Sequence, residues 1–249
     1  MRLTRTHVDL PLAPAIRIDL PADAAAHLLR VLRLCEGDAC VLFNGDGHDY
    51  DARIVAAGKR AGAVEVLGRR PVGNESPLRI TLLQGIARGE KMDLILQKAT
   101  ELGVARIVPL QSQRSEVRLD GERLARRVEH WRAVVVSACE QCGRARLPEL
   151  VAPLPLADIA AATTPGELRL TLDPQGEHAL TALADRPAGA PTRVAVAIGP
   201  EGGWSPRDRE ILATAGFEGL RLGPRVLRTE TAGLAAIAAL QALYGDLRA

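Results

Sequence analysis

Aromatic residues and cysteines are both scarce in this chain. Two Trp, two Tyr and two Phe among 249 residues disfavour a binding mode built on many stacked bases, which needs more aromatic rings. Four cysteines are too few for a disulfide framework in a chain of this size, and the lone C-x-x-C pair, Cys139 and Cys142, falls short of the four ligands of a zinc site. We interpret the cysteines as small, partly buried thiols, with metal or redox work as the alternative, and expect no metal.

Long apolar runs are missing as well. No stretch approaches about eighteen uninterrupted apolar residues, and residues 1–14 carry Arg2 and Arg5 with no apolar run behind them. We therefore expect a cytoplasmic protein with no membrane partner.

Net charge is only +2, but its distribution is uneven. Residues 79–146 hold 13 Lys and Arg against 8 Asp and Glu, and nearly all the cations are arginine, which suits bidentate contacts with phosphate. This pattern is compatible with an RNA partner, and a solvated surface is the alternative.

Two domains are expected from the order of elements. Residues 1–70 contain short strands with turn signals around one helix, at 22–34, which predicts a small β-barrel-like domain. Residues 71–77, with two prolines and a glycine, have the composition of a linker. In residues 78–249 strand-like runs alternate with helical patterns, which predicts an α/β domain with a parallel sheet covered on both faces. Its expected strands are 78–83, 107–110, 168–172, 194–198 and one near 220, and its expected helices are 91–102, 124–139, one from 205 to about 216 and 229–243.

A glycine-rich loop, Ile198 to Trp204, directly follows one of these buried strands, where ligands bind in open α/β sheets. It has neither the Lys-Ser/Thr of a P-loop nor the G-x-G-x-x-G spacing of a dinucleotide fold. The helix after it is well marked, with Ser205 as the cap, Pro206 in the first turn and Asp208 completing a capping box. A purely structural strand-to-helix turn is the alternative for this loop.

A second loop, residues 222–232, opens the terminal helix. Thr229 or Thr231 can cap that helix, and Arg225 and Arg228 flank its N-terminus, where the helix dipole already favours an anion. The loop therefore predicts a site that holds or polarises an electron-rich group.

These two loops resemble the corresponding parts of the RsmE family. The same resemblance extends to residues 27–33, 37–38, 98–104, 113–115 and 140–144, so it covers essentially the whole chain. Members of that family are 16S ribosomal RNA (uracil-1498-N3)-methyltransferases. The resemblance implies a PUA-like RNA-binding domain, followed by a SPOUT-type α/β domain with a trefoil-knotted backbone that binds S-adenosylmethionine. It also implies a homodimer that acts on 16S rRNA in the small ribosomal subunit, with roles in rRNA processing and ribosome biogenesis. The donor-binding residues that it implies are Leu172, Asp173, Ile198, Gly199, Pro200, Glu201, Gly202, Gly203, Leu222, Gly223, Val226, Leu227, Thr229, Thr231 and Ala232.

Methylation of uracil N3 requires loss of the imide proton, which spreads negative charge onto two oxygens. We hypothesise that Arg228 stabilises this charge, with Arg225 as the alternative, and Glu230 is the candidate general base, although it could simply complement the helix dipole. Arg30 and Arg33 lie three apart and are expected to share a helix face. The expected RNA contacts are Arg2, Arg5, Arg30, Arg33, Arg114, Arg144 and Arg225. The rival interpretations are a non-catalytic RNA-binding protein and a methyltransferase of the same architecture that acts on tRNA or on a ribose hydroxyl.

Overall fold

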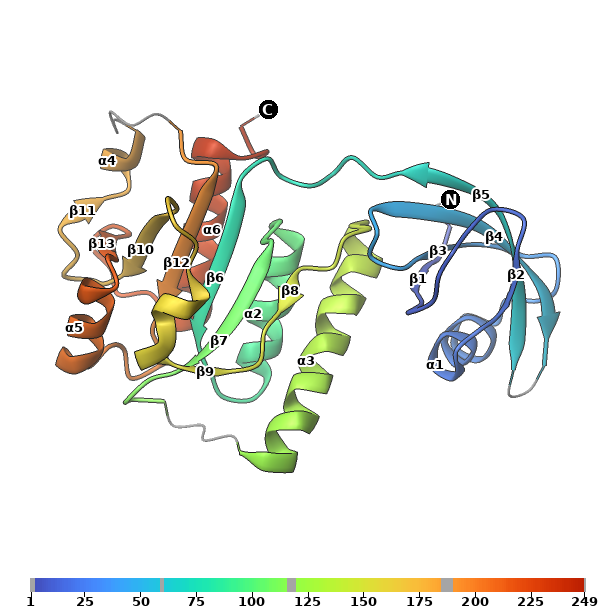
Figure 1. The fold of residues 1–249 in the computed structure, drawn as a ribbon, viewed down its shortest axis with the longest axis horizontal. Helices are drawn as coiled ribbons and strands as arrows, with labels where there is room; N and C mark the ends of the chain where they lie inside the picture. Colours follow the sequence, from blue (N-terminus) through green and yellow to red (C-terminus); the bar gives the residue numbers. More distant parts are fainter. Residues whose placement is uncertain (1–2, 59–60, 116–119, 185–189, 249) are drawn as a thin grey trace. The chain divides into compact units, whose positions relative to one another are not determined.

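The computed structural model describes residues 3–58, 61–115, 120–184 and 190–248 (Figure 1). The chain divides into two compact units, one formed by residues 1–75 with 136–147 and the other by residues 76–135 with 148–249. The division between Glu75 and Ser76 falls inside the predicted linker. The return of residues 136–147 to the first unit was not predicted from the sequence.

The first unit is a five-stranded mixed sheet in the order β1-β3-β4-β5-β2. Its strands are β1 (Arg5–His7), β2 (Arg17–Asp19), β3 (Ala39–Phe43), β4 (His48–Ala57) and β5 (Gly62–Pro71). Strand β1 pairs in parallel with β3, and the other pairings are antiparallel. Two irregularities in the pairing of β4 with β5 bend these long strands, as β-bulges do. The core of this sheet contains Leu28, Leu42, Ile54 and Val64.

The predicted helix at 22–34 is shorter and less regular than expected. An α-helical turn, α1 (Ala22–Ala25), continues as a π-helix, η1 (Ala26–Val31), and Arg33 has a positive φ of 59°. Such wide helical turns are rare. Because the helix ends before Arg33, the prediction that Arg30 and Arg33 share a helix face is wrong.

The second unit is built on a parallel sheet in the order β11-β13-β10-β12-β6-β7-β8, with β9 also pairing to β7. All the pairings of this sheet are parallel, as predicted. The strands are β6 (Arg79–Gly85), β7 (Arg106–Gln111), β8 (Glu149–Leu150), β9 (Leu154–Pro155), β10 (Leu168–Leu172), β11 (His178–Ala179), β12 (Arg193–Ile198) and β13 (Glu218–Arg221). The helices are α2 (Glu90–Glu101), α3 (Gly121–Cys142, whose last residues belong to the first unit), the 3-10 helix η2 (Leu156–Ala162), α4 (Thr181–Ala184), α5 (Pro206–Thr214) and α6 (Thr229–Tyr244).

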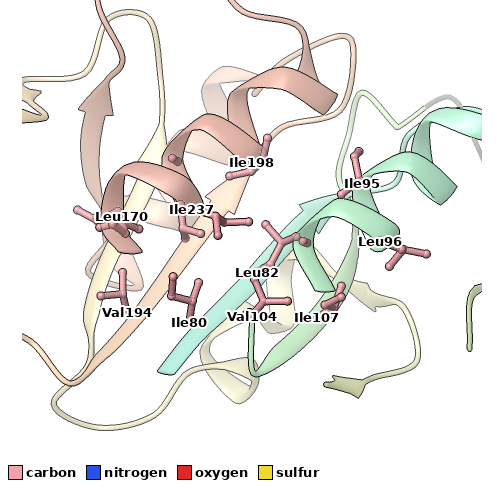
Figure 2. Packing of buried hydrophobic residues seen from close by; sticks show 14 of the residues in the cluster. Ile80, Leu82, Ile95, Leu96, Val104, Ile107, Leu170, Val194, Ile198 and Ile237 are labelled. Atoms are coloured by element: carbon pink, nitrogen blue, oxygen red, sulfur yellow. The ribbon is translucent and has the colours of Figure 1, made fainter. Parts of the chain in front are cut away.

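Separate apolar cores cover the two faces of this sheet. In β12, Val194, Val196 and Ile198 face one core and Ala195 and Ala197 the other, as the two-residue period of a strand requires. Figure 2 shows the first core, where Ile237 of α6 and Ile95 and Leu96 of α2 pack on strand residues that include Ile80, Leu82 and Leu170. The second core is closed by α5 and η2. The prediction of a sheet covered on both faces is therefore confirmed.

The cysteines are free thiols in this structure, and Cys139 and Cys40 are buried. Burial raises the pKa of Cys139 to about 12 and that of Cys40 to about 11, which keeps both as unreactive thiols near neutral pH. Among the described residues there is no group of three or more His, Cys, Asp or Glu that could hold a metal ion. In the same part of the chain, no helix has the length and apolar character needed to cross a membrane.

Candidate functional site

Three loops meet at one edge of the second unit's sheet. They follow β10, β12 and β13, which are neighbours in the order β13-β10-β12 and run in parallel. Because the carboxyl ends of parallel strands lie at the same edge, loops that are separated in sequence come together there. They enclose a cavity of about 480 Å³, within the range of roughly 300 to 1,000 Å³ that is usual for small-molecule sites.

The walls of this cavity contain almost all the residues that were predicted to bind the donor. From that prediction the lining includes Leu172, Asp173, Ile198, Gly199, Pro200, Glu201, Gly202, Gly203, Leu222, Gly223, Val226, Leu227, Thr229 and Ala232. Thr231 is the exception, since it is exposed and lies outside the lining. The proposed catalytic residues Arg228 and Glu230 line the cavity, as do Arg225 and Arg114.

The loop after β12 presents its backbone to the cavity because side chains have little room there. A Cβ atom added to Gly202 would lie 3.1 Å from the Cβ of Arg114, and one added to Gly199 would lie 3.3 Å from Gly203. Gly203 has a φ of +64°, a conformation that glycine adopts without steric cost. Its N–H donates to the carbonyl of Pro200 at 2.8 Å, so the loop turns tightly.

Ser205 ends this loop and caps α5 as predicted. Its hydroxyl accepts from the N–H of Asp208 at 3.1 Å, and the Asp208 carboxylate accepts from the N–H of Ser205 at 2.9 Å. This reciprocal pair is a complete capping box. The start of α6 differs from its prediction, because Arg228 is the N-cap residue and no side-chain hydrogen bond caps the helix. The Thr229 hydroxyl instead donates to the carbonyl of Gly199 at 2.6 Å.

Two carboxylates of the lining are held by neighbouring cations. Asp173 accepts from Nε of Arg209 at 2.5 Å, and Glu201 accepts from the Arg88 N–H at 3.1 Å and from Lys91 Nζ at 3.4 Å. Burial alone would raise the pKa of each carboxyl group, but these hydrogen bonds lower both pKa values overall. Asp173 and Glu201 are therefore ionised and weakly basic at neutral pH.

Glu230 differs from these two carboxylates. Its Oε2 atom is buried, and no described residue makes a hydrogen bond to it. It lies on the first turn of α6, next to Arg228, and the side chain lines the cavity. Arg225 and Arg228 are exposed, and neither forms an ion pair with any other residue in the described part of the chain. The cavity wall therefore combines a Glu230 oxygen that has no hydrogen-bond partner with two guanidinium groups, of Arg225 and Arg228, that form no ion pair, all among the described residues.

Several lining residues were missed by the sequence analysis: Lys91, Trp204, Arg209 and Leu220. Lys91 and Arg209 reach the cavity as partners of Glu201 and Asp173. Each pair joins residues far apart in the sequence, so no local pattern could have revealed it. Trp204 is the last residue of the glycine-rich loop recognised in the sequence, and its place in that loop was the available signal.

The predicted RNA contacts separate into exposed and buried arginines. Arg30, Arg33, Arg114 and Arg225 are exposed. Arg114 and Arg225 also line the cavity, and Arg114 donates to the carbonyl of Gly202 at 2.9 Å. Arg2 lies outside the described residues. The other two predicted contacts, Arg5 and Arg144, are buried.

Arg5 and Arg144 are engaged by protein groups in the first unit. Arg5 is 7% exposed, pairs with Asp49 at 2.6 Å and donates to the Cys139 carbonyl at 2.8 Å. Arg144 is 4% exposed and makes a two-pronged pair with Glu75, at 3.0 and 2.7 Å. The prediction that these two arginines contact RNA does not fit this burial, because a phosphate could not reach either group without breaking an ion pair.

Comparison with known families gives two matches along the chain. Residues 74–241 match the RNA methyltransferase domain family, and residues 20–67 match the RNA methyltransferase PUA domain family. The chain is 33% identical over 230 residues to the ribosomal RNA small subunit methyltransferase E of Buchnera aphidicola subsp. Schizaphis graminum, with 92% of each chain covered. It is 31% identical over 238 residues to the protein of that name from Mycobacterium bovis, with 94% of this chain and 89% of the relative covered.

Solved structures are similar over the whole chain. The ribosomal RNA small subunit methyltransferase E of Neisseria gonorrhoeae, bound to S-adenosyl methionine, has a TM-score of 0.89 and 36% identity, and the match covers 98% of this chain and 99% of that one. A Legionella pneumophila protein named as a methyltransferase, in complex with the bound cofactor SAM, has a TM-score of 0.93 and 39% identity over 99% of this chain and 100% of that one. These matches confirm a PUA domain followed by a parallel-sheet RNA methyltransferase domain, and the SPOUT-type classification stays a prediction, as does the knotted backbone.

Proposed function

Since this chain belongs to the ribosomal RNA small subunit methyltransferase E family and is an RNA methyltransferase, we propose that it transfers a methyl group from S-adenosylmethionine to N3 of the uracil at position 1498 of 16S rRNA. The observation that carries the proposal is the single cavity built by the loops after β10, β12 and β13, with Arg228 and Glu230 in its wall. The proposed substrate is 16S rRNA in the small ribosomal subunit, and the proposed location is the cytoplasm.

The lining of the cavity suits S-adenosylmethionine. Apolar side chains that include Leu172, Ile198 and Leu227 can hold the flat adenine, and the glycine-rich loop offers backbone groups for hydrogen bonds. The steric limits at Gly199 and Gly202 keep that wall free of side chains. When bound, S-adenosylmethionine supplies an electrophilic methyl group on a positively charged sulfur.

The chain's own contribution to the chemistry is to make uracil N3 nucleophilic. We assign the N3 proton to the Glu230 carboxylate, whose Oε2 has no hydrogen-bond partner among the described residues. The negative charge left on the two uracil oxygens is stabilised by Arg228, with Arg225 as the alternative. Arg228 stands at the N-terminus of the 16-residue helix α6, where the helix dipole adds to its positive charge. The N3 atom then forms its bond to the methyl carbon as the bond from that carbon to sulfur breaks.

The first test is methyl transfer from labelled S-adenosylmethionine to small ribosomal subunits that lack the modification, followed by identification of the nucleoside. Label in 3-methyluridine at position 1498 is the expected result. Transfer to another nucleoside, or to tRNA, would refute the proposed target and leave the family assignment standing.

The role of Arg228 is tested by single-turnover methylation with Arg228→Ala, with donor binding measured separately. We expect a rate loss of about 100-fold or more, as for removal of one group that stabilises a developing anion, with the donor still bound. Arg221→Ala is the matched control, because Arg221 is exposed on β13 and lies outside the cavity lining. An unchanged rate for Arg228→Ala would move the role to Arg225.

We further propose that the exposed arginines Arg30, Arg33, Arg114 and Arg225 contact rRNA, and that the protein is a homodimer. Each phosphate contact lowers the affinity for RNA as salt rises. Alanine variants of contacting arginines should therefore reduce the slope of binding against salt, and an unchanged slope would remove that residue from the interface. Analytical ultracentrifugation tests the homodimer.

A further inference from the structure

Gln84, at the end of β6, is completely buried and lies outside the cavity lining. Its Nε2 donates to the Thr229 hydroxyl at 3.0 Å and to the carbonyl of Gly85 at 2.9 Å. The Thr229 hydroxyl in turn donates to the carbonyl of Gly199 at 2.6 Å. One chain of hydrogen bonds thus joins the end of β6, the first residue of α6 and the glycine loop after β12.

The hydrogen atoms in this series of hydrogen bonds have only one consistent arrangement. A hydroxyl has a single hydrogen, and Thr229 gives it to Gly199, so the same oxygen is the acceptor for Gln84. Thr229 lines the cavity, but its only hydrogen is already committed to the loop. The structure therefore gives this hydroxyl a role in holding the loop rather than in donating to a ligand.

The peptide bond between Gly199 and Pro200 has two close neighbours. Thr229 donates to the carbonyl of Gly199. The end of β6 lies so close that a Cβ added to Gly85 would be 2.5 Å from the Pro200 nitrogen. The second turn of α6 also packs closely, since a Cβ added to Gly233 would be 3.3 Å from Cγ1 of Ile198 and 3.4 Å from Oε1 of Gln84.

We propose that Gln84 and Thr229 form a clamp that sets the position of the loop after β12 relative to the start of α6, so that Gln84 is a positioning residue for the methyl donor. The inference rests on the proposed function, because it takes the cavity as the site of S-adenosylmethionine. Gln84 acts without touching the donor. The Gln84 amide donates two hydrogen bonds to this network, to the Thr229 hydroxyl and to the Gly85 carbonyl, while its Oε1 is buried with no hydrogen-bond partner among the described residues. The two donated bonds hold groups that an apolar residue of the same size could not hold.

The clamp is tested by calorimetric titration of S-adenosylmethionine into purified protein, with thermal unfolding measured on the same samples. Gln84→Met keeps the length of the side chain and removes the amide, and Thr229→Val keeps the shape and removes the hydroxyl. We expect each to raise the Kd for the donor about tenfold. Thr229→Ser retains the hydroxyl and should stay within about threefold of the wild type.

Gln241→Met is the matched control. Gln241 is also fully buried and lies on the same helix α6, but it binds Ser76 and the Leu102 carbonyl, away from the cavity. We expect this variant to lose stability and to bind the donor as the wild type does. The double variant Gln84→Met with Thr229→Val should be only slightly weaker than either single variant, because both remove the same chain of hydrogen bonds.

Three results would overturn the clamp: an unchanged donor Kd in Gln84→Met, an equal weakening in Gln241→Met, or fully additive effects in the double variant. If Gln84→Met does not fold, the donor Kd values of Thr229→Val and Thr229→Ser are compared instead, and equal values would overturn the clamp. The proposed function is tested by a different experiment, and it fails if the wild-type reaction yields no 3-methyluridine. The donor titrations would still test the clamp in that case.

Discussion

Replacing Gly85 with alanine should weaken donor binding, although Gly85 is absent from the cavity lining. The new Cβ would lie 2.5 Å from the Pro200 nitrogen and 2.9 Å from the carbonyl carbon of Gly199, where ordinary contacts begin at 3.4 Å. These are backbone atoms of the cavity wall and cannot rotate away. The loop after β12 must therefore move by about 1 Å, and misplacements of that size can cost roughly 100-fold in rate.

The expected magnitudes follow from two opposing effects. Overpacking costs about 1–3 kcal/mol, while the change from glycine to alanine returns roughly 0.4–1 kcal/mol by restricting the unfolded chain. The net destabilisation is about 0–2.6 kcal/mol, which lowers the unfolding midpoint by up to roughly 10 °C in a protein of this size. Because the displaced atoms form the wall, we also expect the donor Kd to rise at least about tenfold, which equals about 1.4 kcal/mol.

The assay pairs thermal unfolding, with and without S-adenosylmethionine, with direct titration of the donor. Gly73→Ala is the control, because nothing lies within 4 Å of a Cβ added there and its φ is not positive. That variant should match the wild type in donor Kd. If Gly85→Ala bound the donor normally at an unchanged midpoint, the idea that the end of β6 supports the cavity wall would be refuted.

Three further predictions concern charge and capping. Arg5→Lys should lower the free energy of unfolding by about 1–3 kcal/mol in chemical denaturation, because a lysine ammonium cannot make all the contacts of the Arg5 guanidinium with Asp49 and the Cys139 carbonyl. The control Arg30→Lys, at an exposed position, should leave the free energy of unfolding unchanged. If the Arg5 variant instead reduced the dependence of RNA affinity on salt, Arg5 would again be an RNA contact. Ser205→Ala removes half of the capping box and should cost about 1 kcal/mol, seen as a lower unfolding midpoint, and an unchanged midpoint would contradict this. The lowered pKa of Asp173 means that its pairing with Arg209 stabilises the fold above the ordinary pKa of 3.8 and that this contribution is lost as pH falls through the lower folded-state value. The difference in stability between the wild type and Asp173→Asn should therefore be constant near neutrality and shrink below pH 3.8, whereas growth on acidification would contradict the assignment.

The elements that could be predicted from the sequence carry their signals locally. Apolar residues at helical spacing mark α2, and Ser205, Pro206 and Asp208 mark the start of α5. The two loops predicted to bind the donor could be found because each follows a strand and opens a helix, and because the family resemblance supports them. The parallel sheet follows from the alternation of strands and helices.

The features that could not be predicted depend on contacts between distant residues. Arg5 was expected at the surface, but its partner Asp49 is 44 residues away and its carbonyl acceptor at Cys139 is 134 residues away. The same holds for Gln84, whose partner Thr229 is 145 residues away. The π-helix that contains Arg30 and ends before Arg33 arises from a small change in hydrogen bonding, which side-chain periodicity does not report.

The membership of residues 136–147 in the first unit has a consequence for how the protein is made. Within that unit, Arg5 depends on the carbonyl of Cys139, and Phe43 packs with Cys139 and Ala145. These partners are synthesised only after residues 76–135, which belong to the other unit. All five strands of the N-terminal sheet are synthesised first, but Arg5 and Phe43 lack these partners until residues 136–147 follow. We therefore expect a fragment that stops at residue 75 to be less stable when expressed alone than the same unit in the whole chain.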